Sequence, residues 1–337
     1  MHHSFEGRIG AAAAGHAVSP AQGIMRGYCV GDSMADTLEI VDSHHHLMDL
    51  GLASYTWMKP GSQHRYGKVD PISRNYLPAD YRSDTAPYRI VADVHVEGHR
   101  DHHHDPLDET RWLAELQLQT ACPTVCIGGA SLEAPDIAAV LSGHAAYEFV
   151  RGIRSSPDTG TLLGPNATAK NISMDDRAWR AGFALLEKYN FVCDLLGLFP
   201  QMEKVVRLAC DFPRTTIILN HMAYPPADLN AEGMAQWRKA VELIAPCTNV
   251  VMKVSGMCMG GPPWRAELHR EPIRHVIATL GVERCMFGSN FPVDRLAGSF
   301  ATIVEGMRSA VSHLNTTQQR QFFRDTAARV YRINLPA

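Results

Sequence analysis

Two histidines one residue apart end the first short apolar run of the sequence, Ile40–His46 (IVDSHHH). Alternate side chains of an extended strand point to the same side, so His44 and His46 can face one way and His45 the other. Imidazoles at this spacing can chelate a divalent metal ion, or can bind and protonate a substrate oxygen. A histidine-rich turn without a function would have the same composition, so the place of this run in the fold decides between the two.

Other short apolar runs also end in polar side chains that suit an active site. His95 and Glu97 close the run VHVE. We expect His95 to bind substrate and Glu97 to act as a base, a metal ligand or an orienter of a histidine. The run VRGIR carries two arginines on opposite faces of a strand. Arg154, nearer the strand end, is expected to bind a carboxylate through its guanidinium fork, and Arg151 to form an ion pair.

Three later runs repeat this pattern. Asp194 ends the run FVCDL, as a substrate-binding residue or as a hydrogen-bonded structural acid. His221 ends the run IILNH, where it can face the first histidine pair. Lys253 shares a strand face with Ser255, and we expect it to stabilise an oxyanion of the bound substrate.

Two further groups lie outside these runs. Tyr55 and Trp57 belong to the long segment after the first run, where they either form an aromatic wall of the site or pin the segment to the fold. The polar stretch Asp101–Asp105 (DHHHD) carries three histidines, and we interpret it as a solvated loop rather than a metal site.

The elements that must position these residues alternate in type along the chain. The predicted strands are Leu38–Ser43, Arg89–Val96, Thr124–Ala130, Phe149–Arg154, Phe191–Leu196, Thr215–Asn220, Asn249–Ser255 and Arg284–Ser289. The predicted helices are Glu109–Thr120, Asp175–Tyr189, Met202–Phe212, Met234–Ile244, Trp264–Leu280 and Phe300–His313, with Thr316–Tyr331 as an extra C-terminal helix. Parallel strands need long crossovers and are buried on both faces, so this order predicts a parallel α/β fold.

Two parallel folds compete, an open doubly wound sheet and a closed (β/α)8 TIM barrel. No GxGxxG follows an early strand, and eight strand–helix units favour the barrel. We expect a single barrel domain over residues 38–337 behind a loose N-terminal extension, residues 1–37. Long inserts after the first strand (Leu47–Pro87) and the fourth (Ser155–Met174) would then cover the carboxyl-terminal face, where barrel active sites lie.

The composition limits which classes of molecule the protein is expected to bind. A net charge of -3 over 337 residues gives no electrostatic reason to expect nucleic acid or a membrane surface. No apolar run approaches the roughly 18 residues that cross a bilayer, and no signal peptide is recognisable, so we expect a cytoplasmic protein. Eight cysteines without CxxC pairs indicate reduced, buried thiols. The expected partner is a small molecule, and the oligomeric state, a homo-oligomer included, stays open.

Taken together, these runs resemble motifs of the amidohydrolase superfamily, in particular its amidohydrolase-2 branch of barrel lactonases. The motifs are DSHHH (Asp42–His46), VHVE (Val94–Glu97), RGIR (Arg151–Arg154), LNH (Leu219–His221), KVSG (Lys253–Gly256) and GSNFP (Gly288–Pro292). The resemblance covers roughly residues 38–332, and its six motifs occur in order, each at a predicted strand end. It implies hydrolysis of sugar lactones or of pyrone dicarboxylate or muconolactone types; more distant members decarboxylate aromatic acids.

Two departures from the family pattern bear on the chemistry. The Lys or Glu that bridges two metal ions on the fourth strand is absent, which argues against a two-metal site. The acid that the family usually has on the eighth strand is replaced by Asn290. An amide can orient water but takes no proton at neutral pH. Asp294, Glu97 or Asp194 must then be the base, or a metal ion must activate the water.

The sequence therefore predicts a hydrolase of a small carboxylated lactone. His44, His46 and His221 would hold one divalent ion, with zinc as first candidate, or would cradle the substrate carbonyl without a metal. The alternatives are a non-oxidative decarboxylase on the same barrel, and a barrel that only binds a small acid. The predicted catalytic residues are His44, His46, His221, Asn290, Asp294 and Glu97, and the predicted substrate-binding residues are Arg154, Lys253, His95, Asp194, Tyr55 and Trp57.

Overall fold

The computed structural model describes residues 38–52, 55–59, 61, 63–64, 67–101, 105–159, 172–257 and 263–335. Two sequence predictions lie outside these ranges: the N-terminal extension, residues 1–37, and the three histidines of the DHHHD stretch, residues 102–104. Part of the second insert, residues 160–171, lies outside them as well.

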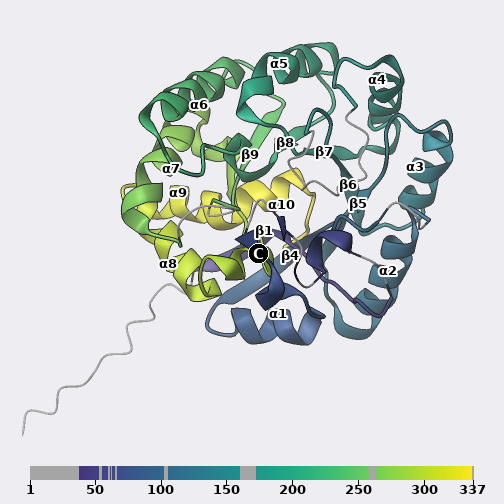
Figure 1. Ribbon diagram of the computed structural model, residues 1–337, viewed down its shortest axis with the longest axis horizontal. Coiled ribbons are helices and arrows are strands. Elements are labelled where there is room, and N and C mark those ends of the chain that lie inside the picture. The colour runs from purple at the N-terminus through teal and green to yellow at the C-terminus, as the bar shows by residue number, and fades with distance from the viewer. Residues whose placement is uncertain are drawn as a thin grey trace, which may run out of the picture. The chain divides into compact units, whose positions relative to one another are not determined.

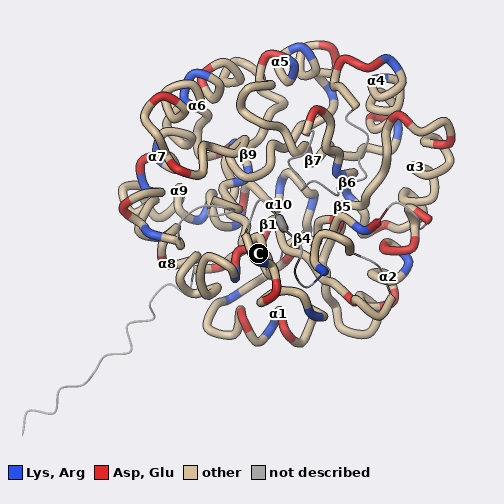
Figure 2. The backbone as a smooth tube through the Cα atoms, viewed as in Figure 1, with Lys and Arg blue, Asp and Glu red and all other residues tan. Residues whose placement is uncertain are grey.

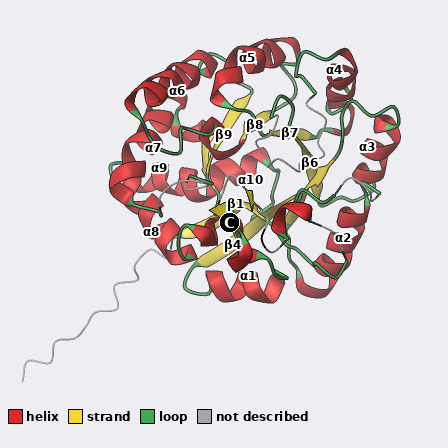
Figure 3. Cartoon of the chain, viewed as in Figure 1, coloured by secondary structure: helices red, strands yellow, loops and turns green. Residues whose placement is uncertain are grey.

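Eight parallel strands form one curved sheet, in which each strand pairs with the next along the chain (Figures 1 and 3). The strands are β1 (Glu39–His45), β4 (Arg89–Val96), β5 (Val125–Gly129), β6 (Val150–Ser155), β7 (Val192–Leu195), β8 (Ile217–Leu219), β9 (Val250–Val254) and β10 (Cys285–Phe287). All eight predicted strands are confirmed. Beyond β10 the chain returns to β1, where the His46 amide donates to the Phe291 carbonyl at 2.7 Å and the Asn290 amide to the His44 carbonyl at 2.7 Å.

Helices surround this barrel (Figure 1). They are α1 (Pro78–Thr85), α2 (Asp108–Thr120), α3 (Ile137–Ala145), α4 (Arg177–Ala184), α5 (Met202–Asp211), α6 (Ala231–Ile244), α7 (Ala266–Leu280), α8 (Phe300–Ala310), α9 (Thr316–Arg320) and α10 (Thr326–Val330). The predicted C-terminal helix is α9 and α10, joined by a π-helical turn over Gln321–Asp325. The sequence analysis did not predict α1 and α3. A short hairpin, β2 (Gln63–His64) and β3 (Gly67–Lys68), lies in the first insert.

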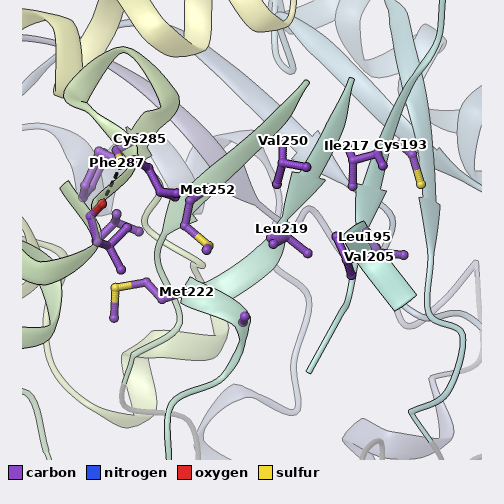
Figure 4. Close-up of a cluster of buried hydrophobic side chains, with 14 of the residues drawn as sticks. Cys193, Leu195, Val205, Ile217, Leu219, Met222, Val250, Met252, Cys285 and Phe287 are labelled. Atoms are coloured by element: carbon purple, nitrogen blue, oxygen red, sulfur yellow. Dashed lines mark hydrogen bonds between the residues drawn. The ribbon is translucent and has the colours of Figure 1, made fainter. Parts of the chain in front are cut away.

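Strand alternation divides the buried residues into two layers. On β7, β8 and β9, one set of apolar side chains packs outward against the helices, as Cys193, Ile217 and Met252 do in Figure 4. Residues of the other parity, such as Val192 and Ile218, form a second cluster in the barrel interior. Each fully buried aliphatic side chain stabilises the fold by about 1.5–3 kcal/mol.

The C-terminal helix α10 completes the interior layer. Ala327, Val330 and Tyr331 pack against interior residues near the amino ends of the strands, including Val41 and Val251. The polar residues of the predicted site follow these apolar residues towards the carboxyl ends. One end of the barrel is therefore closed by apolar packing, and the other holds the polar residues of the predicted site.

Charged residues of both signs lie along the outer helices in the view of Figure 2, with lysines and arginines interspersed among aspartates and glutamates. Among the described helices, none is long and apolar enough to span a bilayer. The cysteines of the described ranges are free thiols, and all of them except Cys210 are buried.

Candidate active site

The histidine pair of β1 lies inside the barrel. His44 Nε2 is 3.2 Å from His46 Nε2, and both side chains are buried. His45 points the opposite way, as strand alternation predicts. Its Nε2 is 2.7 Å from the Asp93 carboxylate on β4, and its ring stacks on Tyr81 of α1 with centroids 4.3 Å apart. The predicted separation of the three histidines by strand face is therefore observed.

His221 joins this pair from a strained turn after β8. Residues 221–224 all have positive φ, between 53° and 57°, and none is glycine. Each such residue costs roughly 1–2 kcal/mol, because the left-handed conformation brings Cβ close to the backbone. The His221 ring lies 4.7 Å from that of His44, centroid to centroid, and its Nδ1 is 2.9 Å from Ser255 Oγ. The Tyr224 ring meets His221 edge-on at 5.2 Å. We call residues 221–224 the left-handed turn.

Lys253 of β9 is buried beside the histidines. Its Nζ lies 3.2 Å from His44 Nδ1, and 2.8 and 3.0 Å from the two carboxylate oxygens of Asp194 on β7. The Tyr331 hydroxyl donates to Asp194 Oδ2 at 2.7 Å, and the Asn220 amide donates to Oδ1. Asp194 was predicted either to bind substrate or to be a hydrogen-bonded structural acid, and Lys253 to stabilise a substrate oxyanion. The structure ties the two side chains to each other and Lys253 to His44, which agrees with the second alternative for Asp194. Tyr331 was not predicted at all, because nothing in an apolar helix end marks a hydroxyl that enters the barrel.

The surroundings of the pair keep both imidazoles neutral. Burial lowers the pKa of His44 well below its usual value, and the charge of Lys253 lowers it further. Burial also lowers the pKa of His46, with Arg154 as the next cause. Burial lowers the pKa of Lys253 to about 8, against the opposing effect of Asp194. At neutral pH the lysine is therefore mostly an ammonium beside two neutral histidines.

The hydrogen-bond partners then determine which ring nitrogens carry protons. An ammonium only donates, so His44 Nδ1 must accept from Lys253. The proton of neutral His44 is consequently on Nε2, from which it donates to His46 Nε2. His46 in turn carries its proton on Nδ1 and donates to the Val96 carbonyl at 2.7 Å. The three bonds form one directional chain from Lys253 to the backbone of β4.

This chain of hydrogen bonds determines whether His44 and His46 can share the predicted metal ion. A metal ion binds the unprotonated nitrogen of an imidazole, and His44 Nε2 is protonated in this arrangement. His44 and His46 therefore do not fit a shared metal ion as they are hydrogen-bonded here. Across the described ranges, no three His, Cys, Asp or Glu side chains converge to hold a metal ion.

An acid lies beside the amide that departs from the family pattern. Asn290 Nδ2 donates to Asp294 Oδ1 at 2.8 Å, and the Asp294 amide closes the turn by donating to the Asn290 carbonyl at 3.0 Å. This fold-back is made by the short 3-10 helix Val293–Leu296. Asp294 is buried, and burial raises its pKa to about 7 in spite of the Asn290 hydrogen bond. Asp294 is thus a group that can take or give a proton near neutral pH.

Arg154, at the end of β6, is buried close enough to lower the pKa values of both paired histidines. Its Nη1 lies 3.3 Å from the Glu97 carbonyl and 3.7 Å from Glu97 Oε1. Its Nε has no hydrogen-bond partner among the described residues. Glu97 also accepts from the His99 amide at 2.7 Å. Arg154 is therefore a buried cation whose Nε–H can still bind an acceptor.

Arg151 differs from its prediction. Its guanidinium donates to the main-chain carbonyl of Glu148, and no ion pair to it occurs within the described ranges. The prediction of an ion pair for Arg151 was wrong. The turn before β6 brings a carbonyl to the guanidinium in place of a carboxylate.

His95 is not part of the cluster. Val94 and Val96 occupy the interior face of β4, so His95 points towards the helices. Its Nδ1 accepts from the Leu47 amide at 3.0 Å, and its Nε2 lies 3.4 Å from Glu109 Oε1 on α2. Burial raises the pKa of Glu109 to about 8. The structure therefore places His95 behind the strand rather than in the predicted substrate site.

The two aromatic residues of the first insert have different surroundings. Tyr55 is buried with Met48 and Met58. Trp57 donates from Nε1 to the Gly98 carbonyl at 3.0 Å, and it packs against a cluster that follows β7, β8 and β10. That cluster consists of Leu196, Tyr224 and Val293. Trp57 thus lies against the carboxyl-terminal side of the barrel, whereas Tyr55 holds the insert in place.

Comparisons with known proteins agree with this fold. A family profile described as amidohydrolase matches residues 41–333. The chain is 32% identical over 300 residues to an uncharacterized protein of Sinorhizobium fredii, covering 88% of this chain and 99% of the relative. It is 27% identical over 310 residues to an L-fucono-1,5-lactonase of Burkholderia multivorans, covering 88% and 97%.

Solved structures give the same architecture. An amidohydrolase of Burkholderia multivorans with bound zinc has a TM-score of 0.72 at 24% identity, covering 88% of this chain and 99% of that one. A probable 2-pyrone-4,6-dicarboxylic acid hydrolase of Acinetobacter baumannii, with citric acid bound, has a TM-score of 0.63 at 10% identity, covering 87% and 99%. At these identities the likeness concerns the barrel fold.

Proposed function

The chain belongs to the amidohydrolase family, and on that premise we propose that it hydrolyses the ring ester of a small lactone bearing a carboxylate. One observation carries the proposal. The buried imidazoles of His44, His46 and His221 meet at the carboxyl-terminal end of the barrel, beside the buried cation of Arg154, and those of His44 and His46 are neutral. The relatives named L-fucono-1,5-lactonase support the lactone class.

The histidines polarise the lactone carbonyl. In the substrate-free protein His44 Nε2–H donates to His46, and with substrate bound it donates to the carbonyl oxygen instead. As water adds, negative charge grows on that oxygen. A buried donor aimed at such a charge is worth on the order of 3 kcal/mol. The ammonium of Lys253 behind His44 favours the same charge, because the site is screened from solvent.

Asp294 and Asn290 handle the attacking water. With a pKa of about 7, Asp294 is partly a carboxylate at neutral pH and can accept the proton of the water. Asn290, hydrogen-bonded to Asp294, orients that water. The tetrahedral adduct then expels the ring oxygen, which takes the proton back from Asp294. The product is an open-chain hydroxy acid, which releases a net proton at neutral pH.

Arg154 selects for a carboxylate on the substrate. A buried N–H without an acceptor costs about 1–3 kcal/mol. A substrate carboxylate would supply that acceptor for Nε and form a charge-assisted bond. Glu97, 3.7 Å away, holds the guanidinium in place from its other side.

A divalent ion on the three histidines is not needed for the steps above. If bound, a zinc ion on His44, His46 and His221 would supply hydroxide by lowering the pKa of its water. The proton order inferred from the hydrogen-bond partners does not leave His44 Nε2 available for it. Elemental analysis of protein purified without a tag, compared with His44→Ala, settles whether a metal is held.

The experiment is a pH-indicator screen over carboxylated lactones, L-fucono-1,5-lactone and other sugar lactones, with chelator and with added zinc in parallel. We expect acid release, fastest from a carboxylated lactone. Proton consumption and CO2 from an aromatic acid, without acid release from any lactone, would overturn the proposal in favour of decarboxylation. Binding without turnover, with activity first created by Asn290→Asp, would overturn it in favour of a barrel that only binds an acid.

A further inference from the structure

We propose that Tyr331, at the C-terminal end of α10, is a positioning residue of the active site. It acts through Asp194 and Lys253 to keep His44 in the form that donates from Nε2. The kinetic consequence of this inference rests on the proposed function, whereas its structural consequence does not.

Tyr331 reaches the site from the closed end of the barrel. Its ring packs with the apolar interior of the strands, and its hydroxyl donates to Asp194 Oδ2 at 2.7 Å. The Lys253 ammonium lies 5.3 Å from the centroid of the same ring. All three side chains are fully buried. A residue outside the eight strands thus holds the only carboxylate that Lys253 contacts within the described residues.

The hydroxyl limits how Asp194 can turn. The Asn220 amide anchors Oδ1 and the Tyr331 hydroxyl anchors Oδ2, so both carboxylate oxygens are fixed by uncharged donors. Lys253 spans these two oxygens at 2.8 and 3.0 Å. An ammonium has three donors, and two of them are used here. The third is left for His44 Nδ1, at 3.2 Å.

The consequence for His44 follows from the order of donors. While Lys253 donates to Nδ1, the imidazole proton must be on Nε2, which is the nitrogen that faces His46 and the site. If the Asp194 carboxylate rotates, the third N–H of Lys253 no longer points at His44 Nδ1. The imidazole proton of His44 can then move from Nε2 to Nδ1. His44 Nε2 would then accept rather than donate, and the carbonyl of a bound lactone would lose its hydrogen-bond donor.

The experiment removes one oxygen atom, that of the Tyr331 hydroxyl. Tyr331→Phe removes the hydroxyl and keeps the ring, its packing and its contact with the lysine. We expect kcat to fall about tenfold with KM changed less than about twofold, the size typical when a group that orients an active-site histidine is lost. Long-range 1H–15N spectra of the histidines, assigned with His44→Gln, should show the His44 proton shifting from Nε2 towards Nδ1.

Tyr76→Phe is the matched control. Tyr76 is also buried, and its hydroxyl donates to the Asp84 carboxylate at the same 2.7 Å. Asp84 pairs with Arg295, and within the described residues neither Tyr76 nor Asp84 has a side-chain bond to His44, Lys253 or Asp194. A purely structural role predicts similar losses of Tm and no change at His44 in both variants. We expect similar Tm values, with the kinetic and spectroscopic changes confined to Tyr331→Phe.

Two results would overturn the inference. One is an unchanged His44 spectrum in Tyr331→Phe. The other is an unchanged kcat in that variant when the wild type is active. If the wild type hydrolyses no lactone at all, the proposed function fails, and the His44 spectrum still decides the role of Tyr331 by itself.

Discussion

The histidines on the two faces of β1 and β4 differ in their partners more than in their burial. Inside the barrel, His44 and His46 contact each other, and neither has a carboxylate partner within the described residues. Behind the strands, His45 is 2.7 Å from Asp93 and His95 is 3.4 Å from Glu109.

This difference separates two uses of the same side chain. A buried histidine with its own carboxylate links neighbouring elements, here β1 to β4 and β4 to α2. Buried histidines that share hydrogen bonds with one another, and not with a carboxyl group, keep their chemistry available to a ligand. Whether a histidine has a carboxyl partner therefore indicates its role better than the number of histidines in its motif does.

Removing one histidine from each face tests whether the two faces divide the roles of catalysis and stability. His44→Ala should lower kcat/KM for a lactone at least about 1000-fold, because it removes the donor to the carbonyl oxygen. His45→Ala should leave kcat within about threefold, but should destabilise the protein by about 3 kcal/mol, because Asp93 loses its buried partner. Steady-state kinetics and urea unfolding of both variants measure this. Equal losses of activity would show that the two faces do not divide the roles.

A second comparison uses the buried acids, because burial raises the pKa of Asp294 to about 7 and of Glu109 to about 8. A base acts when deprotonated, so kcat/KM should fall as pH drops below about 7. It should fall again above about 8, where burial lets Lys253 lose the charge that stabilises the oxyanion. Asp294→Asn should remove the fall on the acid side and lower the rate about 100-fold. Glu109→Gln, behind the strands, should leave the profile in place. A pH profile that follows Glu109 instead would contradict the assignment of Asp294.

The smallest effect is expected from the two arginines of β6. Arg154→Met should raise KM for a carboxylated lactone about tenfold and change KM for a neutral sugar lactone little, since only the former has the acceptor that Arg154 Nε lacks. Arg151→Met should change neither, because its guanidinium bonds a backbone carbonyl. Kinetics with a matched pair of charged and neutral lactones test this. A parallel rise for both substrates would assign Arg154 to packing alone.

Strand alternation explains which parts of the candidate site could be predicted from the sequence. It correctly paired His44 with His46, and it placed Lys253 and Ser255 on one face, where Lys253 bonds His44 and Ser255 bonds His221. Alternation states which residues share a face but not which face is interior. For that reason alternation did not reveal that His95 points away from the barrel interior, towards Glu109.

The remaining differences involve contacts that no local pattern encodes. Tyr331 meets Asp194 across 137 positions of chain, and Asp294 meets Asn290 only because a 3-10 turn folds back. Helix α1 escaped prediction because its sequence, PADYRSDT, has little apolar periodicity. These features depend on how the closed barrel brings distant segments together.

The left-handed turn at residues 221–224 also governs which substitutions its positions tolerate. Met222 and Ala223 are buried and apolar, so a saturation library judged by size and polarity alone would predict that Ile, Val or Thr is acceptable there. Their positive φ reverses that ranking, because β-branched side chains are the least suited to this conformation and asparagine and glycine are the best suited. Proline, whose φ is fixed near −65°, should be absent from all four positions. In a family alignment or a mutational scan, this turn would look like a polar loop although its side chains lie in the core.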